Sequence, residues 1–146
     1  MNNLGVWTSL PSKLYAIGDL HGDFNVLQHV LIDLAKVADY KDKKFHWKGA
    51  DSWLVFCGDL IDRHRRREGI PYTVDDENND KNIINLLIDL DKKARVTNGR
   101  VILLLGNHEL LNFEGAFNYV SEKGHYLGRV DDFTRGSEFA KKIADN

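Results

Sequence analysis

The stretch VILLLGNHE, residues 101–109, decides the fold, because an apolar run stops at Gly106 and polar residues follow at once. The same pattern occurs in LYAIGDLHGD, residues 14–23, and in WLVFCGDLIDR, residues 53–63. Short apolar runs that end at a glycine are typical of buried strands. The sequence therefore predicts three buried strands, each followed directly by a polar loop.

Two helical patterns lie between these runs. The first follows Asp23, which is placed to cap a helix, and its apolar positions are Val26, Leu27, Val30, Leu31, Leu34, Val37 and Ala38. The second follows Asp80, with Gly99 placed to close it, and its apolar positions are Ile83, Ile84, Leu87, Ile88 and Leu90. The sequence thus predicts two helices that alternate with the strands.

This alternation predicts an α/β fold with a parallel sheet and right-handed crossover helices, because neighbouring parallel strands need a long connection. The polar loops then share one edge of the sheet, beyond the carboxyl ends of the strands. Ligands bind at that edge in open α/β sheets. We expect the functional site there.

Composition limits the class of protein. The 146 residues suit a single domain, and 42% hydrophobic and 29% charged residues are ordinary for a globular chain. A formal charge of -2 gives no general reason to expect nucleic acid or an acidic membrane as partner. The single cysteine, Cys57, excludes an internal disulfide and is expected to be a small buried strand residue. We expect a cytoplasmic protein, in which the acidic tract DDENND, residues 75–80, forms a solvated loop.

The three loops carry side chains that bind metals. They are Asp19 and His21 in the first loop, Asp59, Asp62 and Arg63 in the second, and Asn107 and His108 in the third. Carboxylate, imidazole and amide oxygen are all ligands for divalent metals. A glycine followed by aspartate is usually only a turn, but three such loops at one sheet edge indicate a shared site.

The motifs GDLHG, GDLIDR and GNHE, in this order, resemble the three N-terminal motifs of the calcineurin-like metallophosphoesterases, in particular the phosphoprotein phosphatase branch. The continuation GNHELLNFEGAFNYVSEKG is most similar to the Shewanella-like phosphatases. The resemblance implies the N-terminal half of a metallophosphoesterase α/β sandwich. It also implies a metal-dependent phosphomonoester hydrolase, of the serine/threonine protein phosphatase type, that uses a hydroxide bridging two divalent ions of manganese, iron or zinc.

The resemblance also assigns roles to individual residues. Asp19 and His21 would bind the first metal, Asp59 would bridge both metals, and Asn107 would bind the second. Arg63 would hold the phosphate, and His108, oriented by Asp62, would protonate the leaving group. The implied substrate is a phosphorylated protein or a small phosphoester.

The sequence departs from the family pattern in two places. Residue 64 is His where the family motif usually continues with Gly, and it opens HRRRE, which we expect to be a solvated basic loop. The family's later histidine ligands have no counterpart, since only His125 follows His108 and its surroundings do not match. The chain, taken as one domain over residues 1–146, would lack the family's C-terminal half. Weak or single-site metal binding is then expected unless another chain or segment completes the site.

Several alternatives remain at this point. Hydrolases of dinucleoside tetraphosphates share the three motifs, and a phosphodiesterase or nuclease is more distant. A catalytically incomplete fragment that only binds metal or phosphate, or serves as an interaction module, is the non-enzymatic alternative. His29 and His46 fall outside the motifs and are expected to be structural or exposed.

A further rival is a cysteine-dependent phosphatase, because five residues separate Cys57 from Arg63, as in that enzyme class. Two carboxylates, Asp59 and Asp62, would lie in its phosphate cradle, where they would repel phosphate and raise the pKa of the thiol. We predict that Cys57→Ser leaves phosphate ester hydrolysis largely intact. Initial rates of p-nitrophenyl phosphate hydrolysis test this, and a large loss in a folded variant would favour the cysteine mechanism.

Overall fold

The computed structural model describes residues 10–63 and 79–120. Its strands are β1 (Leu14–Ile17), β2 (Ala38–Lys41), β3 (Lys44–Trp47), β4 (Trp53–Phe56) and β5 (Arg100–Leu103). Its α-helices are α1 (Phe24–His29), α2 (Asp80–Ala94) and α3 (Asn107–Phe113). A π-helical segment, Val30–Leu34, continues α1, and a 3₁₀ turn, Arg95–Thr97, continues α2.

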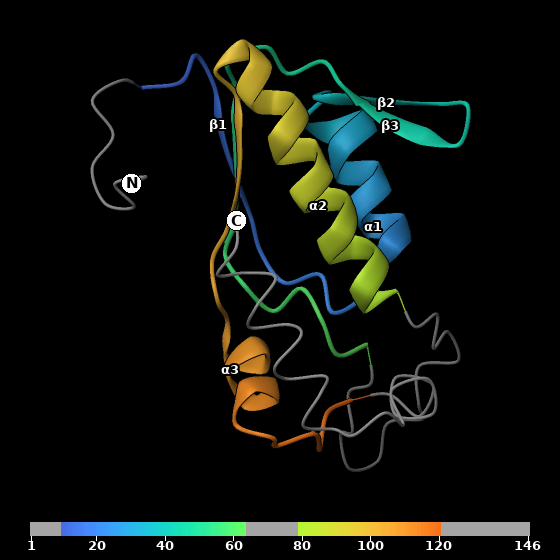
Figure 1. Ribbon diagram of the computed structural model, residues 1–146, viewed down its shortest axis with the longest axis vertical. Coiled ribbons are helices and arrows are strands. Elements are labelled where there is room, and N and C mark those ends of the chain that lie inside the picture. The colour runs from blue at the N-terminus through green and yellow to red at the C-terminus, as the bar shows by residue number, and fades with distance from the viewer. Residues whose placement is uncertain (1–9, 64–78, 121–146) are drawn as a thin grey trace.

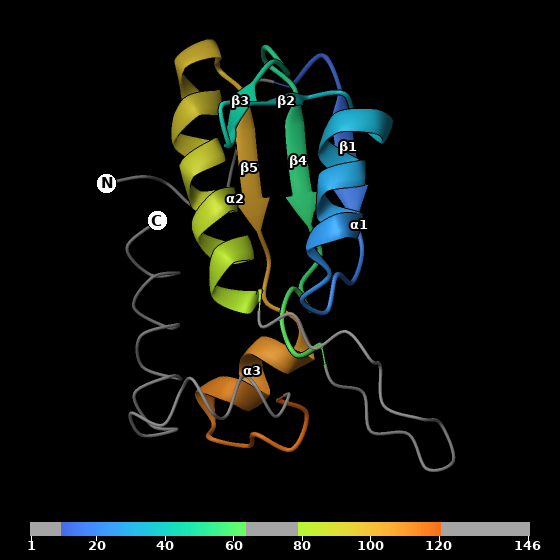
Figure 2. The ribbon, with the colours of Figure 1, turned by 90° about the vertical axis from the view of Figure 1, so that its right-hand side faces the viewer.

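The strands β1, β4 and β5 form a parallel sheet in the order β1-β4-β5, as the sequence predicts. Helices α1 and α2 lie on one face of this sheet, and α3 lies beyond the carboxyl ends of the strands (Figures 1 and 2). The core forms where alternate strand residues meet the helices. Its fully buried side chains include Leu27, Leu31, Leu54, Phe56, Ile83, Ile84, Leu87 and Leu90. The α/β class is confirmed.

The first predicted helix is shorter than expected. Asp23 caps α1 as predicted, since its side chain accepts a hydrogen bond from the Val26 N–H at 2.9 Å. The helical region ends at Leu34, and Lys36 adopts a left-handed backbone with φ 55°. The prediction of helix as far as Ala38 is therefore wrong, because Ala38 begins a strand.

An antiparallel hairpin of β2 and β3, not predicted from the sequence, follows this turn. Asp42 and Lys43 connect its strands, and both have positive φ, 51° and 60°. Two left-handed residues are what a two-residue hairpin turn of right-handed twist requires. The hairpin packs beside the end of α2, where the Lys93 ammonium donates to the Phe45 carbonyl at 2.9 Å.

Helix α2 covers the predicted apolar positions, with two corrections. Asn98, with φ 61°, takes the left-handed position expected of Gly99. Asp80 is buried at the first residue of α2, so the prediction of a solvated loop is wrong at this position. Residues 75–78 of the acidic tract, like the basic run after Arg63, lie outside the described residues.

The prediction that Cys57 is buried is wrong, because its side chain is exposed. Leu54 and Phe56 point toward the helices, so alternation directs Cys57 to the opposite face of the sheet. Leu14 and Leu104 are also exposed, at 58% and 47%. Neither α1 nor α2 covers this face (Figure 1).

No helix in residues 10–63 or 79–120 is long and apolar enough to cross a bilayer.

Asp91 anchors α2 to β5 with a buried carboxylate. It accepts a hydrogen bond from the Val101 N–H at 2.7 Å and pairs with Arg95 and Arg100 at 2.6 and 3.1 Å. A buried carboxylate with three partners holds the helix in register with the strand that leads to the third loop.

We predict that Asp91→Asn lowers the free energy of unfolding by about 2–3 kcal/mol, because charge-assisted bonds are lost in a buried setting. Urea denaturation followed by circular dichroism measures the change. Asp89→Asn is the matched control on the same helix, since its pair with Lys93 is largely exposed and contributes about 0.5 kcal/mol or less. Equal losses in the two variants would contradict the anchoring role of Asp91.

Candidate metal and phosphate site

The first two loops are joined by backbone hydrogen bonds at the carboxyl edge of the sheet. The Asp59 carbonyl accepts from the N–H groups of Leu20 and His21 at 3.0 and 2.9 Å. The Leu60 carbonyl accepts from the Gly22 N–H at 2.8 Å. The loop after β1 therefore lies directly against the loop after β4, as the parallel topology predicts.

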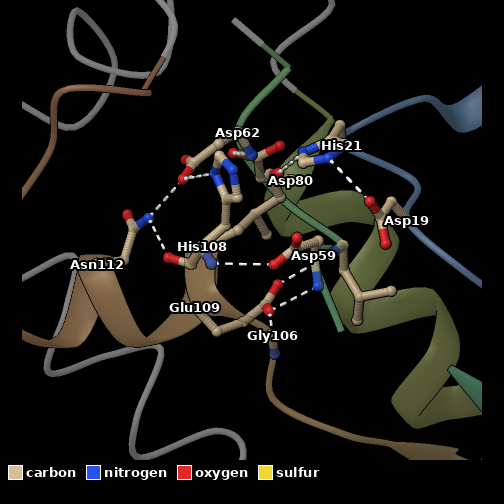
Figure 3. A network of polar contacts seen from close by, with 11 residues as sticks. Asp19, His21, Asp59, Asp62, Asp80, Gly106, His108, Glu109 and Asn112 are labelled. Carbon is tan, nitrogen blue, oxygen red and sulfur yellow. Dashed lines mark hydrogen bonds and ion pairs between the residues drawn. The ribbon is translucent and has the colours of Figure 1, made fainter. Parts of the chain in front are cut away.

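Three residues of these loops have left-handed backbones although they are not glycine. They are His21, Asp59 and Asp62, with φ 45°, 51° and 67°. Such conformations cost on the order of 1–3 kcal/mol each and persist only where the surrounding structure holds them. Here they place His21 and Asp59 beside His108, and Asp62 against the His108 ring (Figure 3).

Glu109 joins the third loop to the second. Its buried carboxylate accepts hydrogen bonds from the N–H groups of Asp59, Leu60 and Gly106, each at 2.8 Å. The bond to Gly106, at the N-cap of α3, also satisfies a donor at the start of this helix. One side chain thus fixes the relative position of Asp59 and α3.

The second and third loops approach too closely for side chains larger than glycine. A Cβ atom added at Gly106 would lie 2.1 Å from the Asp59 carboxylate, and one added at Gly58 would lie 2.2 Å from the Gly106 nitrogen. This approach lets the His108 N–H donate to the Asp59 carboxylate at 3.0 Å. The glycines of GDLIDR and GNHE are therefore needed for contact between the loops.

The geometry around His21 fits a bound cation. Its Nδ1 lies 3.2 Å from the Ile61 carbonyl, which can only accept, so in the neutral ring Nδ1 carries the proton and Nε2 carries a lone pair. The Asp19 carboxylate lies 3.6 Å from Nε2. Both atoms are electron-pair donors, and a metal ion could be bound by the two together.

The structure also brings Asp59 and His108 close to His21. One ligand atom of each residue lies within 4.8 Å of the other two, a spacing at which three groups can hold one ion. Asn107, the predicted ligand of a second metal, is exposed at the first residue of α3, next to His108. The donors present therefore fit divalent metal, and His108 lies where it can act either as a ligand or as an acid.

Asp62 lies against His108, the pair that the sequence predicts. The Asp62 carboxylate is 3.0 Å from Nδ1 of His108 and accepts a second bond from the Asn112 side chain at 2.8 Å. All three side chains are buried. Because the carboxylate accepts at Nδ1, Nε2 is the ring nitrogen left for chemistry.

Arg63 lies at the margin of the site, where its guanidinium pairs with Asp23 at 2.6 Å. Burial alone would raise the pKa of the Asp23 carboxyl, but hydrogen bonds from the Val26 N–H and Arg63 outweigh it and hold the pKa below its ordinary 3.8. The stabilisation is present above that value and is lost as the pH falls through the lower pKa of the folded state. Asp23 thus orients the residue predicted to hold phosphate.

The remaining histidines and three further polar residues complete the description. His29 and His46 are exposed, as expected, while His64 and His125 lie outside the described residues.

Glu109, Asn112 and Asp80 were not predicted as site residues. A signal existed for Glu109, three residues after the N-cap glycine, and for Asn112, a polar residue one turn after His108 in an apolar stretch. Asp80 accepts from the Asp62 N–H at 3.3 Å, a contact that no local pattern indicates.

Comparisons with known proteins place this geometry in context. Residues 12–142 match the family described as Calcineurin-like phosphoesterase. The chain is 33% identical over 114 residues to Shewanella-like protein phosphatase 2 of Arabidopsis thaliana, covering 78% of this chain and 25% of the relative. It is 40% identical over 111 residues to Shewanella-like protein phosphatase 1 of Plasmodium berghei, covering 76% and 26%. The chain thus spans about a quarter of the length of these relatives.

The fold is similar to that of a solved structure, a cold-active protein-tyrosine phosphatase of a psychrophilic Shewanella species. The TM-score is 0.69 at 23% sequence identity, over 92% of this chain and 37% of the other. At this identity the comparison supports the fold.

We predict that Glu109→Gln destabilises the chain by about 2–3 kcal/mol, because an amide replaces the ionised acceptor of three backbone donors. Metal affinity should fall with it, since Asp59 and His108 lose their common support. Thermal unfolding and titration calorimetry with Mn²⁺ measure the two effects. Glu114→Gln, at the exposed end of α3, is the control. An unchanged Mn²⁺ affinity in folded Glu109→Gln would show that the three bonds do not support the site.

Proposed function

Since the chain belongs to the calcineurin-like phosphoesterase family, we propose that it is a metal-dependent phosphomonoester hydrolase of the serine/threonine protein phosphatase type. The observation that carries the proposal is the buried pair of Asp62 and His108 beside the His21 and Asp59 donors. A histidine that a buried carboxylate orients is suited to transfer a proton to a leaving group. The names of the relatives, both protein phosphatases, support a phosphoprotein or small phosphoester substrate.

The proposed metal ligands are Asp19, His21, Asp59 and Asn107, with Asp59 shared between two ions. Their oxygen and nitrogen donors suit manganese, iron or zinc. When bound, the ions would polarise a phosphoryl oxygen and lower the pKa of water. Because the chain matches about a quarter of its relatives' length, we propose that another chain or segment supplies further ligands. We also propose a cytoplasmic setting, on the sequence composition.

The side chains of this protein would perform the remaining steps. Asp62 holds the His108 ring through Nδ1, so that Nε2 is the atom that delivers a proton to the departing oxygen. The Arg63 guanidinium, which Asp23 orients, would hold phosphoryl oxygens through its planar fork of donors. The charge of the transition state is then met by a fixed cation.

We predict that His108→Asn slows hydrolysis of phosphoserine by a factor on the order of 10²–10⁴, because an alkoxide is a poor leaving group without an acid. The loss on p-nitrophenyl phosphate should be distinctly smaller, since p-nitrophenolate departs without a proton. Steady-state rates on both substrates, with metal content by elemental analysis, measure the effect.

Asn107→Ala is the matched control, on the neighbouring residue. It should reduce both rates together and lower the metal content, as expected of a ligand. Equal losses on the two substrates for His108→Asn, with reduced metal content, would show that His108 is a ligand and not the acid. These variants are measured in a form of the protein that carries the further ligands, and no metal-dependent hydrolysis in that form, with the chelator-treated protein as the blank, would contradict the proposed function itself.

A further inference from the structure

Asn112, one helical turn after His108 in α3, is almost fully buried, with 1% of its surface exposed. Its side-chain nitrogen donates to the Asp62 carboxylate at 2.8 Å and to the His108 carbonyl at 2.9 Å. Neither partner has a proton to donate, since one is a carboxylate and the other a peptide carbonyl. The nitrogen of the amide must therefore face them, and both of its protons are used.

This arrangement links two elements that carry the acid pair. Asp62 belongs to the loop after β4 and has a left-handed backbone, whereas His108 belongs to α3. The Asn112 amide contacts both, so it holds the loop carboxylate at a fixed place relative to the helix. The same Asp62 oxygen contacts His108 Nδ1 at 3.0 Å and the Asn112 side-chain nitrogen. If the Asn112 amide were removed, this oxygen would keep the contact with Nδ1 but lose the second donor that fixes its position.

The orientation of Asp62 decides which nitrogen of His108 carries the proton. A carboxylate held at Nδ1 stabilises the Nδ1–H tautomer and leaves the lone pair on Nε2. A carboxylate that moves away removes this preference, and the ring then divides between two tautomers. The imidazolium, whose second proton on Nε2 is the one to be transferred, would also lose the carboxylate that stabilises it.

We propose that Asn112 is a positioning residue, which locks Asp62 onto Nδ1 of His108 and thereby keeps Nε2 as the proton-transferring atom. The effect of Asn112 on the rate of hydrolysis rests on the proposed function. Its effect on the tautomer of the His108 ring can be measured without any hydrolysis. Asn112 contacts no reacting group, and acts through Asp62.

The test uses the ¹⁵N-labelled, metal-free chain and long-range ¹⁵N–¹H correlation spectra of the His108 ring. The unmodified chain should show the Nδ1–H tautomer. Asn112→Leu, whose side chain has similar volume and no hydrogen-bond donor, should show a mixture of the two tautomers. If Asn112→Leu does not fold, Asn112→Ala is used in its place and should show the same mixture. Asn82→Leu, on the exposed face of α2, is the matched control and should leave the His108 signals unchanged.

Turnover provides the second measurement. In Asn112→Leu, kcat for phosphoserine should fall by about 10–100-fold, with a smaller loss on p-nitrophenyl phosphate and little change in KM. Ile84→Val, in the core away from the site, controls for reduced stability and should lower neither rate selectively.

The two claims fail separately. An unchanged His108 tautomer in a folded Asn112 variant would overturn the positioning role, and so would equal losses on the two substrates. A shifted tautomer in this chain, together with no phosphate ester hydrolysis in a form that carries the further ligands, would support the positioning role and contradict the proposed function.

Discussion

The buried carboxylate of Glu109 is the interaction on which the rest of the site depends. A charge buried without partners costs several kcal/mol, and each charge-assisted hydrogen bond returns about 1.5–3 kcal/mol. The carboxylate is therefore stable in this position only when its N–H partners on both loops are in place together. The second loop, the start of α3 and the polar side chains that they carry thus form as one unit, and none of them can shift without breaking the others.

The same unit explains why unfavourable backbone conformations persist there. His21, Asp59 and Asp62 are left-handed, and peptide groups around them form hydrogen bonds from one loop to the other. The free-energy cost of these conformations is offset by favourable contacts elsewhere in the fold. These include the pairing of the sheet strands and the close approach of Gly58 to Gly106. An acid-rich edge of this kind is prepared for a cation before the cation arrives, which reduces the reorganisation that binding requires.

The parallel sheet and its loops could be predicted because each apolar run ends in a glycine and a polar segment, a signal contained within about ten residues. The hairpin was missed because a few apolar residues after Leu34 fit helical and strand spacing equally well. Glu109 and Asn112 could not be assigned from the sequence, since each acts on partners up to 50 residues away. Their roles arise from tertiary packing, whereas the roles of Asp62 and His108 were inferred from the resemblance alone.

The sheet face opposite α1 and α2 has a consequence for the protein in solution. Among the described residues, Leu14 and Leu104 are 58% and 47% exposed there, and the Cys57 thiol is exposed on the same face. Exposed apolar side chains on one face favour self-association, and an accessible thiol can convert a transient encounter into a covalent one. We expect the chain to stay monodisperse only when dilute and kept reduced, so that its concentration and redox conditions govern its behaviour as much as its catalytic loops do.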